Sequence, residues 1–494
     1  MLFNSYIFIF AFFPLCLLGF YLLKRCNQTA AKIWLTGFSL WFYGYFNYSY
    51  LLIMLFSILF NYAIYQCMMY CKKEKKGFGE NLKFKKEKWI LVLGIMVNLL
   101  VLFYFKYYDF FVLNLNAVFK TSYVLKNVLL PLGISFFTFQ QISFLTDAYR
   151  GEIKACKFVD YALFVSFFPQ LIAGPIVTHE EMLPQFQEIG KKVTEETFVK
   201  GLFLFVLGMG KKVLIADTFG LAVDAGYGMI ASLNSVDAIL IMLFYTLQLY
   251  YDFSGYCDMA IGIGGMMGIQ IPLNFNSPYK ASNIIDFWKR WHITLSRFFT
   301  KNIYIPLGGN RKGQLRMYVN LFLIFFLSGL WHGAGWNFVL WGVMHGVLYC
   351  ITRYVQLHGE CKKSVLGIVF TFLYVNVAWV FFRSATITEA MHLFRRMFIG
   401  GFSLPNVTIA ECFNLDEFWY ILKIFHLTDW MYGKYILMIV FTLVILLATF
   451  FSKNVHEIVR NCKFTWVSAA VSAILFVWCV VSLSGVSTFL YFNF

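Results

Sequence analysis

Three observations in the 494-residue chain predict an all-α, polytopic integral membrane protein. Hydrophobic residues make up 60% of the sequence and charged residues only 13%, a composition that is unusual for a soluble domain. Apolar runs long enough to cross a bilayer recur along the whole chain and predict about 11 spans. The basic residues stand between these runs, where the positive-inside rule explains them as cytosolic flanks. The formal net charge of +16 therefore reflects membrane topology, and we exclude nucleic acid as a partner.

The N-terminal part of the sequence predicts five spans. Leu2 to Leu23 lacks a basic region before it and a clear cleavage site, so it is expected to be a retained first span. Ile33 to Tyr70 is long enough for two spans that turn near Asn47. Trp89 to Phe111 and Val128 to Tyr149 follow as an outward and a returning span.

Phe158 to Ile176 is apolar but has the residues of a broken helix. Pro169 and Pro175 remove backbone donors, and Gly174 loosens the chain between them. A broken or re-entrant helix is tolerated at membrane depth only where it is buried in protein or lines a cavity. We therefore expect this segment to line a cavity.

Further spans are expected from the later apolar stretches. They follow Phe198 to Leu207 and comprise Val236 to Ile271, Tyr435 to Phe451 and Phe464 to Leu483. Asp252 lies within Val236 to Ile271. A carboxylate there indicates either an interior polar track or a structural pair with a lysine or the backbone.

The strongest candidate for chemistry is a histidine in LSGLWHGAGWNFVLWGVMHG, Leu327 to Gly346. An ionisable group at membrane depth is costly, so His332 is either functional or a structural histidine bonded to a neighbouring helix. The surrounding glycines let backbones or a thin ligand approach closely. If a helix begins near Tyr318, His332 lies roughly 21 Å along its axis, inside the hydrocarbon core. This pattern predicts a pocket around His332.

A second constellation covers Asp286 to Lys301, which has the pattern of one amphipathic helix at the membrane surface. His292 lies four residues after Trp288 and so faces the apolar side of that helix. Basic residues there and just beyond either hold the phosphates of a nucleotide-like ligand or anchor the segment on anionic lipid. They are Arg297, Arg311, Lys312 and Arg316.

Several motifs occur together in an order that resembles a known family. They are PQLIAGPI, LQLYYDFSGYCDMAIG, NFNSPY, FWKRWHITLSRFFTKNIYIPLGGNRKG, LSGLWHGAGWNFVLWGVMHG and VAWVFFRS. They look like the membrane-bound O-acyltransferase family, and more closely like its bacterial polysaccharide O-acetyltransferases of the alginate type. The likeness runs from about Phe168 to Arg383 and reappears at the C-terminus. It implies a helical bundle with re-entrant or broken helices around a central tunnel.

The resemblance also implies roles for individual residues. The family's catalytic histidine in the WHG motif matches His332, and the assisting histidine of its RWH motif matches His292. A buried neutral imidazole accepts a proton from an attacking hydroxyl. Endings similar to FLYFNF carry a tyrosine suggested to hold the acyl group transiently, which matches Tyr491. Taken alone, such an aromatic cluster packs or anchors at the membrane interface.

The implied donor is cytosolic acetyl-CoA, with no permanently bound cofactor and no metal. Its phosphates are expected near Arg297, Arg311, Lys312 and Arg316, with its pantetheine arm reaching a pocket beside His332. The expected pocket-lining residues are Trp331, Gly333, Trp336, Asn337, Trp288 and Asp252.

The implied acceptor is an exported cell-envelope polysaccharide such as alginate or peptidoglycan, reached through a separate extracytoplasmic O-acetyltransferase. The implied location is the bacterial cytoplasmic (inner) membrane. Two alternatives stay open at this point: a D-alanyl transferase for teichoic acid, and a transporter or flippase that transfers no acyl group.

No linker or repeat divides the chain, so we expect one integral membrane domain, 1–494, with its catalytic core at 286–346. Residues 384–434 read as an interfacial or exposed segment. Within it, Thr386 and Glu389 match a capping box, and Met391, Phe394 and Phe398 form an apolar stripe typical of a short surface helix.

Overall fold

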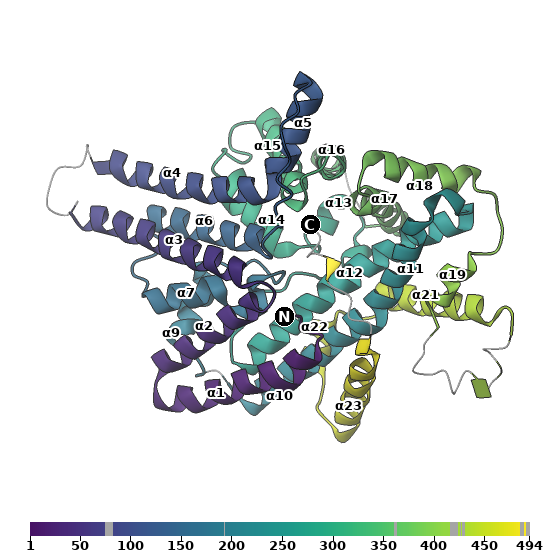
Figure 1. Cartoon of the computed structure of the whole chain (residues 1–494), viewed down its shortest axis with the longest axis horizontal. Coiled ribbons are helices and arrows are strands. Elements are labelled where there is room, and N and C mark those ends of the chain that lie inside the picture. Colours follow the sequence, from purple (N-terminus) through teal and green to yellow (C-terminus); the bar gives the residue numbers. More distant parts are fainter. Residues whose placement is uncertain are drawn as a thin grey trace. The chain divides into compact units, whose positions relative to one another are not determined.

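The computed structural model describes residues 1–74, 83–191, 193–359, 363–414, 423–424, 426, 430–484 and 489–490. Within these ranges the regular structure is helical, and no strand occurs (Figure 1). Two compact units form, Met1–Leu202 with Ala260–Pro272, and Phe203–Met259 with Leu273–Phe494. The predicted all-α fold is confirmed, whereas the single domain and the central tunnel stay predictions.

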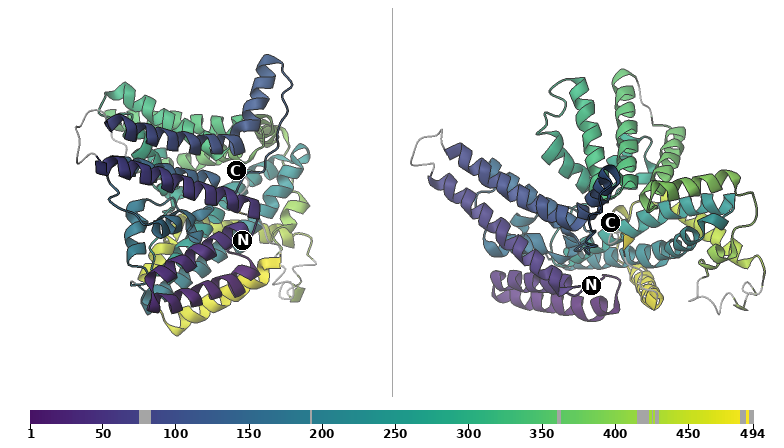
Figure 2. Two further views of the ribbon diagram at one scale, coloured as in Figure 1. Left: turned by 60° about the vertical axis from the view of Figure 1, so that its left-hand side comes forward. Right: turned by 45° about the horizontal axis from the view of Figure 1, so that its top comes forward.

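The first unit contains the N-terminal helices, in which η marks a short π or 3-10 turn. They are η1 (Phe8–Phe12), α1 (Phe13–Cys26), α2 (Gln28–Gly44), α3 (Tyr48–Glu74), α4 (Lys83–Leu102), η2 (Phe103–Tyr107), α5 (Tyr108–Phe119), α6 (Ile134–Arg150), α7 (Phe158–Ser166), α8 (Phe168–Leu171) and α9 (His179–Gln187). Helices α3 and α4 lie side by side in both figures, and each contacts α6 (Figures 1 and 2).

Two sequence predictions in this unit are confirmed. The chain turns near Asn47, because α2 ends at Gly44 and α3 begins at Tyr48. The stretch predicted to be broken is divided at Phe167, which separates α7 from the four-residue helix α8. Pro169 stands in the first turn of α8, where its missing N–H removes no helical hydrogen bond.

A polar cluster joins α6 to α9 in the same unit, with Asp147 and His179 buried and Glu152 exposed. His179 Nδ1 lies 2.9 Å from Asp147 Oδ2, and Glu152 brings a carboxylate oxygen within 4.8 Å of both groups. Such a donor set could hold a cation, but Arg150 places a guanidinium nitrogen 3.5 Å from Asp147 Oδ1. The positive charge of Arg150 repels a metal cation at the same carboxylate. That the protein binds no metal stays a prediction.

The second unit contains the remaining helices, with α10 (Glu195–Gly210) and α12 contributing residues to both units. They are η3 (Lys211–Ala216), α11 (Asp217–Gly228), η4 (Ile230–Ser232), α12 (Ser235–Met266), η5 (Pro278–Lys280), α13 (Ile284–Trp288), α14 (Ile293–Phe299), η6 (Thr300–Tyr304), α15 (Gln314–His332), α16 (Trp336–His358), α17 (Val365–Arg383), α18 (Ile387–Ile399), α19 (Val407–Glu411), α21 (Gly433–Phe451), α22 (Val455–Asn461), α23 (Trp466–Val481) and η8 (Ser482–Ser484).

Helices α15 and α16 form an antiparallel hairpin with their backbones in close contact (Figure 2). A Cβ atom at Gly329 would collide with the carbonyl oxygen of Phe338, and one at Gly342 would collide with that of Phe325. The sequence predicted that glycines here let backbones or a thin ligand approach closely. In the structure, the groups that approach each other are the backbones of α15 and α16.

The expected helix start near Tyr318 is wrong, because α15 begins at Gln314 and ends at His332. His332 thus lies about 27 Å from the start of its helix at 1.5 Å per residue. The helix stops because Gly333 leaves the helical conformation, with φ −162° and ψ 153°. The Leu327 to Gly346 stretch is the tip of a helical hairpin, and His332 stands at that tip.

Eight helical segments in the described ranges are long and apolar enough to cross a membrane. They are Phe8–Cys26, Tyr48–Lys72, Lys86–Phe119, Ser235–Met266, Gln314–His332, Trp336–His358, Val365–Arg383 and Gly433–Phe451. Three expected spans form shorter helices, since α2 and α6 have 17 residues each and α23 has 16. The polytopic class is confirmed, and the total of about 11 spans stays a prediction.

The segment 384–434 is described in part. The side-chain oxygen of Thr386 accepts a hydrogen bond from the Glu389 backbone N–H at the start of α18, as the capping signal predicts. The predicted short surface helix is confirmed as α18, which buries Ala390 and Leu393 and leaves Met391 52% and Phe398 85% exposed. The spacing of apolar residues predicted the helix, but the elements packed against α18 decide which of its faces is buried.

Candidate active site

His292 stands at a break in the backbone between two short helices. The expected single helix from Asp286 to Lys301 is wrong: α13 ends at Trp288 and α14 begins at Ile293. His292 is the N-cap of α14 with φ 43° and ψ 52°, a left-handed conformation that few residues other than glycine adopt. Such a conformation persists only where its surroundings impose it. The prediction that His292 faces apolar groups is confirmed, since the residue is 0% exposed.

Asn274 holds the ring of His292 in one orientation. His292 Nδ1 lies 3.1 Å from Asn274 Oδ1, which also accepts hydrogen bonds from the backbone N–H of Thr294 at 3.2 Å and its hydroxyl at 2.9 Å. A backbone N–H only donates, so the atom facing it is the amide oxygen of Asn274. The neutral His292 ring must then carry its proton on Nδ1, which leaves a lone pair on Nε2.

Burial determines the charge of His292. The residue lies between α13 and α14, outside the eight candidate spans, and burial lowers its pKa from 6.5 to about 3. Desolvation disfavours the imidazolium, and an amide partner does not compensate for it as a carboxylate would. His292 is therefore neutral at pH 7. With Nδ1 bonded to Asn274, the neutral ring is fixed in orientation and presents Nε2 as a hydrogen-bond acceptor.

His332 lies beside His292, and the two are called the histidine pair below. Their ring centroids are 6.4 Å apart, and His332 is 3% exposed. Three aromatic rings surround His332 at centroid distances of 4.8 to 5.1 Å, and one of them, Trp331, also lies 6.0 Å from His292. The other two are Trp341 and Phe382. The structure thus brings together two histidines that are 40 positions apart in the sequence.

A third buried histidine adjoins the pair and was not singled out from the sequence. His345 in α16 is fully buried, and its Nδ1 accepts a hydrogen bond from Trp288 Nε1 at 3.3 Å. Its ring is 4.8 Å from that of Trp341, which also contacts His332. The sequence signal that could have identified His345 is its position in the apolar WGVMHG run, because a histidine buried in an apolar helix needs a polar partner. His345 fixes the Trp288 indole, and Trp288 lines the cavity described next.

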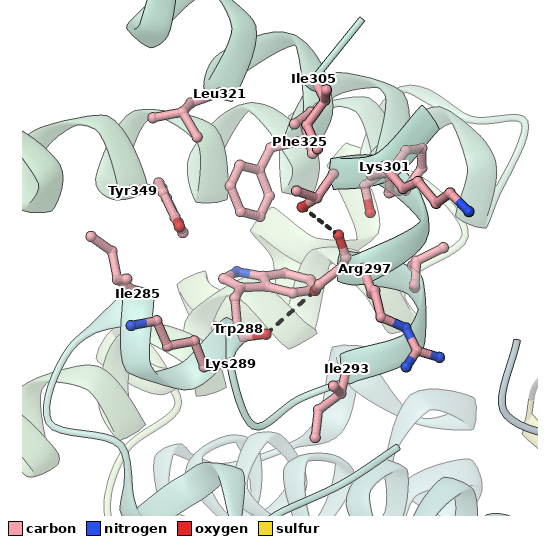
Figure 3. Close-up of a pocket in the computed structure, with 16 residues that line it drawn as sticks. Ile285, Trp288, Lys289, Ile293, Arg297, Lys301, Ile305, Leu321, Phe325 and Tyr349 are labelled. Atoms are coloured by element: carbon pink, nitrogen blue, oxygen red, sulfur yellow. Dashed lines mark hydrogen bonds between the residues drawn. The ribbon is translucent and has the colours of Figure 1, made fainter. Parts of the chain in front are cut away.

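A cavity of about 540 Å³ opens between α13, α14 and the α15–α16 hairpin (Figure 3). Its walls are mainly apolar, and Figure 3 shows the Trp288 indole between the charged ends of Lys289 on one side and of Arg297 and Lys301 on the other. The volume lies in the range of small-molecule sites, about 300 to 1,000 Å³. An apolar chamber with cations around it suits a ligand that has an apolar arm and an anionic head.

The inner wall of this cavity adjoins the histidine pair along the chain. Ser328 lines it and lies four residues before His332 in α15, on the same helix face and about 6 Å away along the axis. Ile293 also lines it and follows His292 directly. The cavity therefore reaches residues near both histidines in the chain, but neither His292 nor His332 is among its lining residues.

The predicted donor-binding residues occupy two different places. Arg297 lines the cavity, as do Lys289 and Lys301, which were noted in the sequence only as charges on the amphipathic helix. The other three are exposed and lie in the loop before α15 or in its first turn: Arg311, Lys312 and Arg316.

The predicted pocket-lining residues also lie in different places. Trp288 lines the cavity, and Gly333 ends the helix that carries His332. Asn337 is buried and donates to the carbonyl oxygen of Ser384 at 2.8 Å, which ties α16 to the end of α17. Trp336 is 58% exposed. Asp252 forms a buried ion pair with a lysine, one of the two alternatives that the sequence left open.

Two further features are the predicted role of Tyr491 and the state of the cysteines. Tyr491 lies outside the described residues, so its role stays a prediction. Ten cysteines fall within the described ranges, and each of them is a free thiol.

The chain is similar to known proteins along most of its length. The signature of the MBOAT, membrane-bound O-acyltransferase family matches residues 39–391. A "Peptidoglycan O-acetyltransferase" of Helicobacter pylori is 39% identical over 100% of this chain and 98% of the relative. A "Probable alginate O-acetylase AlgI" of Pseudomonas putida is 39% identical over 83% of this chain and 82% of the relative. A "Teichoic acid D-alanyltransferase" of Bacillus subtilis is 28% identical over 52% of this chain and 69% of the relative.

The chain belongs to the membrane-bound O-acyltransferase family, as its motifs predicted. It is therefore an acyltransferase and a multi-pass membrane enzyme, and the alternative of a transporter that transfers no acyl group is excluded.

Proposed function

We propose that this protein transfers an acetyl group from cytosolic acetyl-CoA toward an exported cell-envelope polysaccharide. The observation that supports this best is the cavity of about 540 Å³, two of whose lining residues, Ser328 and Ile293, lie four residues before His332 and directly after His292 in the chain. Its apolar lining suits the pantetheine arm of the donor, and Lys289, Arg297 and Lys301 suit the donor's phosphates. Arg311, Lys312 and Arg316 are assigned to the approach of the same anion, where exposed cations attract it before it enters.

The proposed reaction is acyl transfer with His332 as general base. Its imidazole takes the proton of the acceptor hydroxyl while the hydroxyl oxygen forms a bond to the thioester carbonyl carbon. The carbon–sulfur bond then breaks, and the departing thiolate recovers that proton from the imidazolium. His292, neutral and oriented by Asn274, positions a reacting group by hydrogen bonding. No metal or redox cofactor is needed, because the thioester supplies the driving force.

The acceptor side of the proposal draws on the relatives. Two of them, each 39% identical, are named for acetylation of peptidoglycan and of alginate, both exported polysaccharides. The peptidoglycan relative aligns along the whole chain, so we take peptidoglycan as the first acceptor to test. We place the enzyme in the bacterial inner membrane, where a separate extracytoplasmic O-acetyltransferase completes the transfer.

Tyr491 offers two routes for the acetyl group. In one, the acceptor hydroxyl attacks the thioester directly. In the other, the Tyr491 phenol oxygen attacks the thioester carbon, the carbon–sulfur bond breaks, and CoA leaves as the thiol with the phenol's proton. The acceptor hydroxyl then attacks the acetyl ester of Tyr491, which takes up the hydroxyl's proton and is restored as the phenol. Intact-mass detection of a single acetyl group on Tyr491, together with lost turnover in Tyr491→Phe, distinguishes the relay from direct transfer.

The experiment that tests the function follows the label. Membranes that contain the enzyme and its partner, and membranes that lack only the enzyme, are given acetyl-CoA labelled in the acetyl group, and label is chased into protein and into peptidoglycan. Transfer that needs this enzyme supports the proposal. Transfer of D-alanine from a loaded carrier protein, without transfer of acetyl, would instead support the teichoic acid alternative. The relative that motivates this alternative is 28% identical.

A further inference from the structure

The hydrogen bond between His345 and Trp288 determines which ring nitrogen of His345 carries the proton. His345 is 0% exposed in α16, and its Nδ1 lies 3.3 Å from Trp288 Nε1. An indole N–H only donates, so Nδ1 must present a lone pair, and the imidazole is neutral with its proton on Nε2. Toward Trp288, His345 is therefore a hydrogen-bond acceptor.

The second ring nitrogen of His345 has no such bond. Nε2 is buried and lacks a hydrogen-bond partner among the residues that the structure describes. Aromatic rings surround the imidazole, with Trp341 at a centroid distance of 4.8 Å and Tyr374 at 5.8 Å. A buried N–H without a partner costs free energy that a phenylalanine at this position would not cost. Stability therefore does not explain a histidine here, whereas the bond to Trp288 does.

Trp288 is held at its backbone and at its side chain. Its carbonyl oxygen accepts a hydrogen bond from the Ser296 hydroxyl at 3.3 Å, which ties the end of α13 to α14. Its indole N–H donates to His345, which ties the same residue to α16. Bonds at both ends of the residue restrict the indole to one orientation, and Figure 3 shows that indole among the side chains that line the cavity.

Trp288 also lies between a residue of the cavity wall and a residue that contacts His332. Its ring is 5.1 Å from that of Phe325, which lines the cavity. It is 5.9 Å from the ring of Trp341, which is 5.1 Å from His332. The ring of His345 contacts both indoles, but His345 is not among the residues that line the cavity. A side chain behind the wall thus orients a side chain in the wall.

We propose that His345 is a positioning residue for the acyl donor. By accepting the Trp288 indole N–H, it fixes the flat apolar wall against which the donor's arm packs, and so sets the affinity for the donor. The inference rests on the proposed function, because it takes the donor to be acetyl-CoA.

Binding of CoA to the full-length enzyme in detergent, measured by isothermal titration calorimetry, tests this role without turnover. His345→Phe keeps a buried ring but removes the acceptor, so the indole of Trp288 loses its fixed orientation. We expect the Kd for CoA to rise about fivefold to tenfold, the size of one net hydrogen bond. His345→Asn, whose amide oxygen can take the place of Nδ1, should keep the Kd within about twofold of the wild type.

Asn376→Leu is the matched control. Asn376 is also buried, at 1% exposed, but its amide donates to the carbonyl oxygen of Phe372 within α17, and it does not line the cavity. Its loss should leave the Kd for CoA unchanged. An unchanged Kd in His345→Phe, or an equal rise in His345→Phe and Asn376→Leu, would overturn the positioning role.

Thermal unfolding separates positioning from stability. His345→Phe exchanges one buried unpaired donor, Nε2–H, for another, the indole N–H of Trp288. We therefore expect its Tm to stay within about 2 °C of the wild type while the Kd rises. A rise in Kd that comes only with a much larger loss of Tm would show that the bond serves stability, and would overturn the proposal.

A second background tests whether His345 acts through Trp288, and it covers the case in which His345→Phe misfolds. Trp288→Phe removes the indole N–H, and adding His345→Phe then removes both bonding partners with little net change in volume. In the Trp288→Phe background the second substitution should change the Kd by less than about twofold, because no N–H is left to orient. A further rise as large as that in the wild-type background would overturn the proposal.

The binding experiment also distinguishes this inference from the proposed function. If the wild type binds no CoA, the proposed donor is wrong, and the positioning of that donor by His345 is overturned with it. If the wild type binds CoA and His345→Phe binds it equally well, the proposed donor stands and only the positioning role is overturned.

Discussion

His292 and His332 are equally buried and adjacent, yet the protein holds them by different means. His292 sits at a left-handed backbone position and is oriented by the oxygen of Asn274, with its pKa lowered to about 3 by burial. His332 ends a long helix and lies among aromatic rings. The comparison teaches that one imidazole is fixed by a side-chain amide and the other by ring packing, and the proposed mechanism assigns proton transfer to the second.

The largest expected effect separates the two histidines directly. His332→Ala should lower acetyl turnover by about 10² to 10⁴, the range for removal of a general base, while the protein still accumulates in the membrane. Turnover is measured with labelled acetyl-CoA at equal amounts of folded enzyme. Full activity in this variant would end the assignment of His332 as base.

Changes around His292 should cost less, because that residue orients and does not abstract. His292→Asn keeps a residue that tolerates the left-handed backbone, and we expect kcat to fall about tenfold to a hundredfold. Asn274→Ala, which removes the partner of Nδ1, should cost about tenfold through the lost orientation. A loss in His292→Asn as large as that in His332→Ala would reverse the two roles.

The pH dependence of stability tests the charge of His292. In the folded protein its pKa is about 3, against 6.5 in the unfolded chain, so the unfolded state binds more protons between these values. The contribution of His292 to the free energy of unfolding therefore falls as pH drops below 6.5. At pH 5 this penalty is about 2 kcal/mol.

Thermal unfolding of wild type and His292→Gln in detergent checks this slope. The variant should lose about 2 kcal/mol less than the wild type between pH 7.5 and pH 5, because glutamine does not titrate. The pH 7.5 measurement is the control, since His292 is neutral in both states there. Parallel pH profiles for the two proteins would mean that His292 is solvated in the folded state.

The smallest effect concerns the cations around the cavity. Arg297→Gln should raise the KM for acetyl-CoA about threefold to tenfold with kcat nearly unchanged, because Arg297 lines the cavity and would bind the donor uniformly. Arg316→Gln is the matched control at an exposed position, and its effect should be smaller and weaken with added salt. Equal effects of the two substitutions would place the donor's phosphates outside the cavity.

Much of the fold was predictable because it depends on local composition. Apolar runs, prolines and turn residues predicted the all-α membrane class, the turn near Asn47 and the break at Phe167. The motifs predicted the family and both histidines. The helix from Asp286 to Lys301 was predicted wrongly because the apolar spacing continues unbroken through His292. The break there depends on Asn274, 18 positions earlier in the chain.

Composition and hydropathy by themselves predict a polytopic membrane protein, and the order of the motifs, through their resemblance to the membrane-bound O-acyltransferases, adds the acyltransferase class. Both signals are properties of neighbouring residues. They do not establish which groups meet. The pairing of Asp252 with Lys212 and Leu490 and the bond of Trp288 to His345 join residues 40, 238 and 57 positions apart. Such contacts form only when the helices pack, because a buried polar group accepts whichever partner the packing brings within hydrogen-bond distance.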